Sequence, residues 1–183
     1  MKIQLQELQH QKEALQAILE NFPRIDTAKE QEANANPILE NAGNEKFFID
    51  CKMETGTGKT YVYTRLMYEL HQKLGIFKFI IIVPSLAIKE GTKIFISSDY
   101  AKQHFNRFFP NKKINLQTIY SGGFSTKKRK TFPVGLLQFC DSSKNETNAI
   151  QCLLLSDKGF LDRKDTSLFK DDYDQTFYGS LEC

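Results

Sequence analysis

The sequence predicts an α/β domain in which helices flank a mostly parallel sheet. Short apolar runs alternate along the chain with segments of helical periodicity, and the run 77–83 (FKFIIIV) is apolar at every position except Lys78. Alternating strands and helices are typical of parallel sheets, and a continuous apolar run is typical of a strand buried on both faces. Ligands of such sheets bind beyond the carboxyl ends of the strands. The turns that follow the apolar runs are therefore the places to search for a functional site.

The N-terminal region is predicted to be a helix followed by a mobile connection. Apolar residues recur at helical spacing over roughly residues 3–22, and Pro23 closes this helix. Residues 24–45 are polar, rich in Asn, Ala and Glu, and interrupted by proline and glycine. Such a composition is typical of a connection, with one helical turn at most. We therefore expect a helical segment over 1–23 and a linker over 24–45.

Residues 46–160 are expected to contain the sheet and its helices. Helices are predicted over 59–74 and 86–109, the second of which breaks near Ser98. The chain then becomes polar and acidic, so we expect residues 161–183 to form a poorly ordered tail. The predicted strands are 46–52, 77–83, 116–120 and 150–155.

The composition is that of a globular protein with a mild positive charge. The chain has 183 residues, 40% of them hydrophobic and 26% charged, and a formal net charge of +3. This charge permits contact with nucleic acid but does not by itself argue for it. The four cysteines lack C-x-x-C spacing and none of the three histidines is paired at metal-ligand spacing, so a zinc site is not expected. No run approaches the roughly 18 apolar residues of a membrane span, and we expect a cytoplasmic protein without membrane contact.

A glycine-rich turn, METGTGKT at 53–60, follows the apolar run FFIDC and precedes a predicted helix. A turn of this kind binds phosphate, because backbone N–H groups and about half a positive charge from the helix dipole point at the anion. Lys59 is predicted to be the catalytic residue that reaches the β- and γ-phosphates, and the Thr60 hydroxyl to ligate Mg²⁺. Met53 stands where the usual pattern has glycine, and the alternative is a chance turn that caps an ordinary helix. The predicted phosphate-binding residues are Thr55, Gly56, Thr57, Gly58, Lys59 and Thr60.

Three further segments are candidates for ligand contact. Gln11 lies within the apolar stripe of the first helix, where its amide matches the N6 donor and N7 acceptor of adenine; the alternative, favoured by the residues alone, is a stripe-edge glutamine that reaches water. Ser85 begins a predicted helix, so it either caps that helix or, with Lys89, binds a backbone phosphate of nucleic acid. The basic run at 127–130 is either a solvated loop or a nucleic-acid contact.

The order of four segments resembles the Res subunit of type III restriction endonucleases, which are superfamily 2 helicase-like motors. These segments are Gln11, METGTGKT, VPSLAIKEG at 83–91 and LLLSDKGF at 153–160. The resemblance covers about residues 1–178 and is weakest at 24–45 and 122–147. METGTGKT is a typical first motif of that family, so Met53 is no defect.

The resemblance implies a P-loop, RecA-like motor domain that uses ATP and Mg²⁺. In it, Gln11 reads adenine, and Ser85 and Lys89 lie near the DNA backbone. It also implies double-stranded DNA and a DNA methyltransferase (Mod) subunit as partners. The parent enzyme would couple ATP hydrolysis to movement along DNA, or to a switch on it, before cleavage.

Motors of this family hold magnesium and activate water with an Asp-Glu-Pro-His motif, whereas no Asp-Glu dipeptide occurs in this chain. We therefore expect an incomplete motor domain, the N-terminal part of a Res subunit, that is either a cloned fragment or a truncated gene product. It should bind ATP weakly and hydrolyse it negligibly. One alternative is a stand-alone DNA-binding or regulatory protein that keeps the motor fold without catalysis. Another is a different nucleoside triphosphatase whose acid is Asp157 or Asp162.

Overall fold

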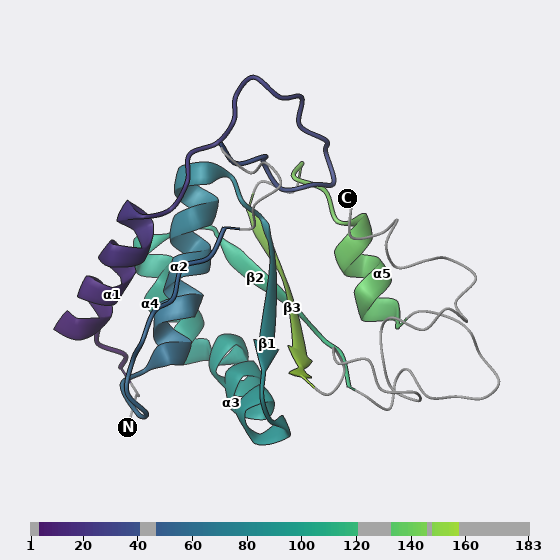
Figure 1. Ribbon diagram of the computed structural model, residues 1–183. Coiled ribbons are helices and arrows are strands. Elements are labelled where there is room, and N and C mark those ends of the chain that lie inside the picture. Colours follow the sequence, from purple (N-terminus) through teal and green to yellow (C-terminus); the bar gives the residue numbers. More distant parts are fainter. Residues whose placement is uncertain (1–3, 41–46, 121–132, 146–147, 158–183) are drawn as a thin grey trace.

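The computed structural model describes residues 4–40, 47–120, 133–145 and 148–157. Their centre is a three-stranded sheet of order β1-β3-β2 in which both pairings are parallel (Figure 1). This confirms the predicted α/β class with a parallel sheet. The strands are β1 (Lys78–Val83), β2 (Lys113–Thr118) and β3 (Ala149–Ser156).

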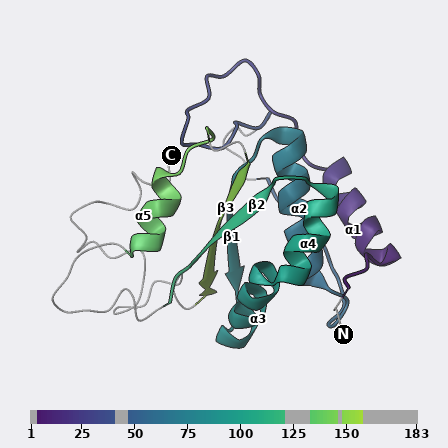
Figure 2. The same ribbon diagram turned by 180° about the vertical axis from the view of Figure 1, so that it is seen from behind.

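Helices cover both faces of the sheet unequally. The first four lie on one face and α5 lies on the other, as Figures 1 and 2 show from opposite sides. The helices are α1 (Gln9–Glu20), α2 (Lys59–Leu74), α3 (Leu86–Ser97), α4 (Asp99–Phe108) and α5 (Val134–Asp141).

The central strand β3 is buried along its whole length and separates two apolar clusters. Ile150 and Cys152 belong to the larger cluster, which contains the aromatic side chains of α2 and α4. Leu153 and Leu155 belong to the smaller cluster, which packs under α5. Neighbouring strand residues point to opposite faces, so one apolar run serves both clusters.

The ends of the helices follow the predicted signals. The predicted helix 59–74 matches α2, and its C-cap Gly75 has φ 69°, a left-handed conformation that suits glycine. The predicted break in 86–109 lies at Ser98, whose hydroxyl accepts a hydrogen bond of 3.3 Å from the Ala101 N–H and caps α4. The strands predicted at 77–83, 116–120 and 150–155 correspond to β1, β2 and β3.

The predicted strand at 46–52 is wrong for its described part. Residues 47–52 form no strand, and Phe48 is 81% exposed. Phe47 instead meets Phe22 edge-on, with ring centroids 6.0 Å apart. An apolar run becomes a strand only when a neighbouring strand accepts its hydrogen bonds, and the run itself does not specify that neighbour.

The N-terminal helix is shorter than predicted, and one helix was not predicted. α1 begins at Gln9 because the Gln11 side chain accepts a 3.1 Å hydrogen bond from the Leu8 N–H. Leu5 therefore lies outside the helix and packs against the larger apolar cluster. The unpredicted helix is α5, in which Leu136 and Phe139 are buried.

The segment 24–40, part of the predicted linker, is hydrogen-bonded to the sheet. Ile25 and Leu39 form an isolated antiparallel bridge. The Asn36 side chain accepts hydrogen bonds from the N–H groups of Phe77 (3.0 Å) and Lys78 (2.9 Å) and donates one of 2.8 Å to the Lys78 carbonyl. These bonds attach the segment to the start of β1.

Several expectations concern residues outside the described ranges, namely the basic run at 127–130, Asp162 and the tail at 161–183. Within those ranges, every helix is too short or too polar to cross a membrane.

Candidate functional site

The glycine-rich turn leads directly into α2. Gly56 has φ 85° and Gly58, the N-cap of α2, has φ 86°. Both values lie in the left-handed region, which glycine adopts without the steric cost of a Cβ. The sequence G-x-G thus places two flexible positions around Thr57, and the loop can curl over the start of the helix.

Two side chains of the loop share one carbonyl. The Thr57 hydroxyl donates a 2.7 Å hydrogen bond to the Glu54 carbonyl, and the Lys59 ammonium donates one of 2.9 Å to the same oxygen. Lys59 is exposed, and the first turn of α2 contains no acidic residue. The helix N-terminus and an accessible ammonium are therefore both available to an anion.

Gln11 lies against this loop. It is 6% exposed, and its Nε2 donates a 3.0 Å hydrogen bond to the Thr57 carbonyl. A Cβ on Gly58 would lie 2.4 Å from this Nε2, so the approach requires glycine. The alternative in which Gln11 reaches water at the stripe edge is wrong. Among the described contacts, one amide hydrogen and one lone pair of Gln11 have no partner.

His10 was not predicted as a site residue. Its Nε2 lies 2.9 Å from the same Thr57 carbonyl oxygen, and the side chain is exposed. No motif marks this position. The only sequence signal is that His10 precedes Gln11 where α1 begins.

Ser85 caps a helix, whereas Lys89 is buried inside the protein. Ser85 caps α3, since its Oγ accepts a 3.3 Å hydrogen bond from the Ile88 N–H. Lys89 is fully buried and donates to the Ile119 carbonyl, with its ammonium 4.0 Å from the centroid of the Tyr120 ring. Burial lowers the pKa of Lys89, because it removes water from the charged form. This inward direction argues against direct contact between Lys89 and a DNA phosphate.

The glycine-rich turn at 53–60, called the phosphate loop below after its predicted role, lies at the same end of the sheet as Ser85. β1 ends at Val83, and α3 starts three residues later. In Figure 1, α2 and α3 both begin at the end where the strands finish. This is the ligand-binding end of a parallel sheet.

Comparison with known proteins identifies the family. The family model described as "Type III restriction enzyme, res subunit" matches residues 4–173. The chain belongs to this family.

Three relatives are Res subunits. The StyLTI Res subunit of Salmonella typhimurium is 51% identical over 183 residues, which are 99% of this chain and 18% of the relative. The EcoPI Res subunit of Escherichia phage P1 is 39% identical over 109 residues, covering 59% of this chain and 11% of the relative. The EcoP15I Res subunit of Escherichia coli is 35% identical over 131 residues, covering 68% of this chain and 13% of the relative. The chain thus spans less than a fifth of the length of each of these relatives.

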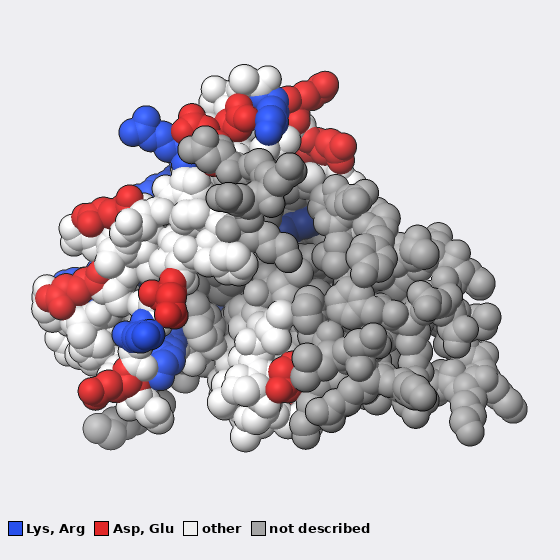
Figure 3. All heavy atoms as spheres, viewed as in Figure 1, with Lys and Arg blue, Asp and Glu red and all other residues white. Residues whose placement is uncertain are grey.

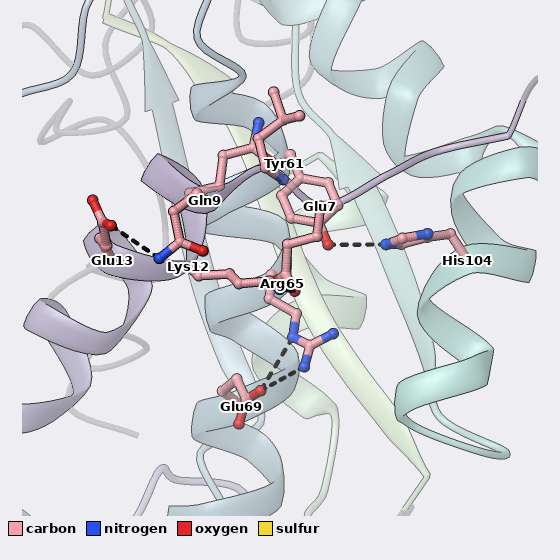
Figure 4. A network of polar contacts seen from close by, with 10 residues as sticks. Glu7, Gln9, Lys12, Glu13, Tyr61, Arg65, Glu69 and His104 are labelled. Atoms are coloured by element: carbon pink, nitrogen blue, oxygen red, sulfur yellow. Dashed lines mark hydrogen bonds and ion pairs between the residues drawn. The ribbon is translucent and has the colours of Figure 1, made fainter.

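In this Res-family chain, a polar network supports the helix that follows the phosphate loop (Figure 4). The Tyr61 hydroxyl and His104 Nε2 are 2.9 Å apart and join α2 to α4. On the next turn, Arg65 donates to Glu69 at 3.1 and 2.9 Å, and its guanidinium lies 4.1 Å from the centroid of the Phe108 ring. Burial is the main cause that raises the pKa of Tyr61 and lowers the pKa of His104. The Tyr61–His104 and Arg65–Phe108 contacts thus join α2 to α4.

The described ranges hold no group of three His, Cys, Asp or Glu side chains that could bind a metal ion. Thr60, in the first turn of α2, is the residue whose type suits Mg²⁺ held together with phosphate. Asp157 follows β3 directly and therefore lies at the ligand-binding end of the sheet.

The coloured part of the surface in Figure 3 shows no patch of a single charge sign. Basic and acidic side chains are interspersed there over α1 and the segment 24–40, within the coloured part of the surface. Interspersed charges of this kind are typical of solvated surfaces.

Proposed function

We propose that this chain is the ATP-binding part of a Res-subunit motor domain. The observation that carries the proposal is the phosphate loop at the end of the sheet, where Lys59 is exposed and α2 begins without an acidic residue. The residues fit a magnesium-bound nucleoside triphosphate: the N–H groups and Lys59 would bind phosphate oxygens, and Thr60 would hold the ion. The metal ion would neutralise charge on the phosphates.

Gln11 is proposed to read the base of the nucleotide. Its amide is held by Leu8 and Thr57, which leaves a donor and an acceptor in a fixed orientation. This pair matches N7 and N6 of adenine, whereas guanine offers two acceptors at this edge. ATP is therefore expected to bind more tightly than GTP.

The proposed division of the chain follows from these roles. Residues 1–23 contribute the base-reading helix, 24–45 connect it, and 46–160 form part of a RecA-like nucleotide-binding domain. In the whole Res subunit this region would couple ATP hydrolysis to action on double-stranded DNA, with a Mod methyltransferase as partner, in the cytoplasm. Ser85 is the proposed backbone contact, and Lys89 is proposed to support it indirectly from within α3.

The nucleotide proposal is tested by calorimetric titration of the 183-residue chain with ATP and Mg²⁺. Lys59→Ala should weaken binding at least about tenfold, because a charge-assisted contact to phosphate is worth roughly 1.5–3 kcal/mol. Lys73→Ala is the matched control, since Lys73 is exposed in the last turn of the same helix. Equal affinities for wild type and Lys59→Ala would contradict the proposal.

We further propose that the chain alone hydrolyses ATP negligibly. Its sequence contains no Asp-Glu pair to position magnesium and the attacking water. A phosphate-release assay should show no turnover above background, and robust turnover that Lys59→Ala abolishes would overturn this expectation. DNA affinity is measured separately, by titration at several salt concentrations. Binding that persists unchanged in Lys59→Ala without nucleotide would favour the stand-alone DNA-binding protein instead.

A further inference from the structure

Two consecutive residues of α1 hold one carbonyl of the phosphate loop. His10 Nε2 and Gln11 Nε2 lie 2.9 and 3.0 Å from the Thr57 oxygen. A carbonyl oxygen only accepts hydrogen bonds, so both nitrogens are donors. Gln11 is buried and His10 is exposed. The loop is therefore fixed from one side by two independent side chains of the same helix.

This contact sets the direction of a neighbouring N–H group. The described residues contain no cis peptide bond, and in a planar trans peptide the C=O and the following N–H point in opposite directions. Because the Thr57 carbonyl points at α1, the Gly58 N–H points away from α1. Backbone N–H groups of this loop are the groups that bind phosphate.

The glycine at position 58 gives this peptide rotational freedom. The Thr57–Gly58 peptide rotates about ψ of Thr57 and φ of Gly58, and Gly58 has φ 86°. Glycine populates positive and negative φ about equally, so this peptide could rotate at low cost without an external contact. A rotated peptide would present a carbonyl oxygen to the anion in place of a donor.

We propose that His10 and Gln11 together fix the plane of the Thr57–Gly58 peptide, so that the Gly58 N–H is oriented for phosphate before the nucleotide binds. This makes His10 a positioning residue of the phosphate site. The inference rests on the proposed nucleotide function and adds to it a role for α1 that is independent of the base.

The ligand test compares ATP, GTP and inorganic tripolyphosphate, each with Mg²⁺, by calorimetric titration of the full chain. His10→Ala should weaken all three about fivefold, the effect of losing one hydrogen bond. His10→Gln keeps an N–H donor and should restore most of the affinity. Gln9→Ala is the control, because Gln9 is exposed on the same helix and bonds only to Glu13 among the described contacts. A loss confined to ATP would overturn the proposal, since it would place His10 at the base.

A second measurement needs no ligand. The amide resonance of Gly58 in a ¹H–¹⁵N spectrum should shift in His10→Ala and return close to its wild-type position in His10→Gln. An unchanged Gly58 resonance in His10→Ala would overturn the proposal. If the wild-type chain bound none of the three ligands, the proposed nucleotide function would fail, and the Gly58 resonance would still decide whether α1 holds the loop.

Discussion

Replacing Gly58 by alanine is expected to destabilise the chain more than the same replacement at Gly56. The two glycines have nearly equal φ values of 86° and 85°. Their surroundings differ, because a Cβ on Gly58 would lie 2.4 Å from Gln11 Nε2, whereas a Cβ on Gly56 would meet nothing within 4 Å. Gly56→Ala is thus a matched control for backbone strain.

The expected difference follows from the contacts of Gln11. Alanine in the left-handed region costs about 1–2 kcal/mol, and this cost applies to both variants. In Gly58→Ala the Gln11 Nε2 must also move away from the new Cβ and lose its hydrogen bond to Thr57. The Thr57 carbonyl keeps His10, but the buried Gln11 amide loses a partner, and leaving a buried polar group without a partner costs about 1–3 kcal/mol. We therefore expect losses of about 1–2 kcal/mol for Gly56→Ala and about 2–5 kcal/mol for Gly58→Ala.

Urea unfolding followed by far-UV circular dichroism measures both losses, and it suits a chain without tryptophan. A double variant, Gln11→Ala with Gly58→Ala, checks the cause. Once the Gln11 amide is gone, the additional cost of Gly58→Ala should fall to that of Gly56→Ala. Equal destabilisation by the two single glycine variants would refute the reasoning.

Three further predictions concern buried groups. Lys89→Met keeps the apolar stem but leaves the Ile119 carbonyl without its donor, so the free energy of unfolding should fall by about 1–3 kcal/mol in urea titrations. Burial lowers the pKa of His104 in the folded chain. Below about pH 6.5 the unfolded chain therefore binds a proton at this histidine more readily than the folded chain does, and the folded state loses stability. Between about pH 7.5 and 5.5 the Tm of the wild type should fall more than that of His104→Gln. Burial raises the pKa of Cys152 to about 12, so in the native chain iodoacetamide should label exposed Cys51 well before Cys152, as peptide mass spectrometry would show.

The local elements of the fold were accessible to sequence reasoning. Helix α2 was predicted with its correct bounds, since apolar spacing, the G-K-T start and Gly75 are all local signals. β1 and β3 were predicted because a continuous apolar run favours a strand. Burial on both faces holds for the central strand β3, whereas β1 lies at the edge of the described sheet and exposes Ile80 and Ile82. The segment 47–52 has an equally apolar start but forms no strand, since pairing depends on a neighbour elsewhere in the chain.

Sequence reasoning could predict only part of the candidate site. The loop 53–60 was predicted to bind phosphate because its glycines and its lysine occupy the positions that phosphate binding requires, and the helix expected after it is α2. Lys89 was predicted to lie near the DNA backbone together with Ser85, whereas its ammonium is buried and donates to the Ile119 carbonyl. A lysine on a helix usually points to water. The inward direction of Lys89 depends on the Ile119 carbonyl, which is 30 residues away in the sequence.

The sequence by itself determined the glycine-rich turn 53–60, the helix that follows it and the family of the chain, because these depend on residue types within short motifs. Tertiary structure alone decided that α1 packs against the loop, with Gln11 buried and His10 bonded to Thr57. That contact joins residues 47 positions apart. Its formation depends on how α1 packs on α2, and no local pattern of either segment encodes that packing.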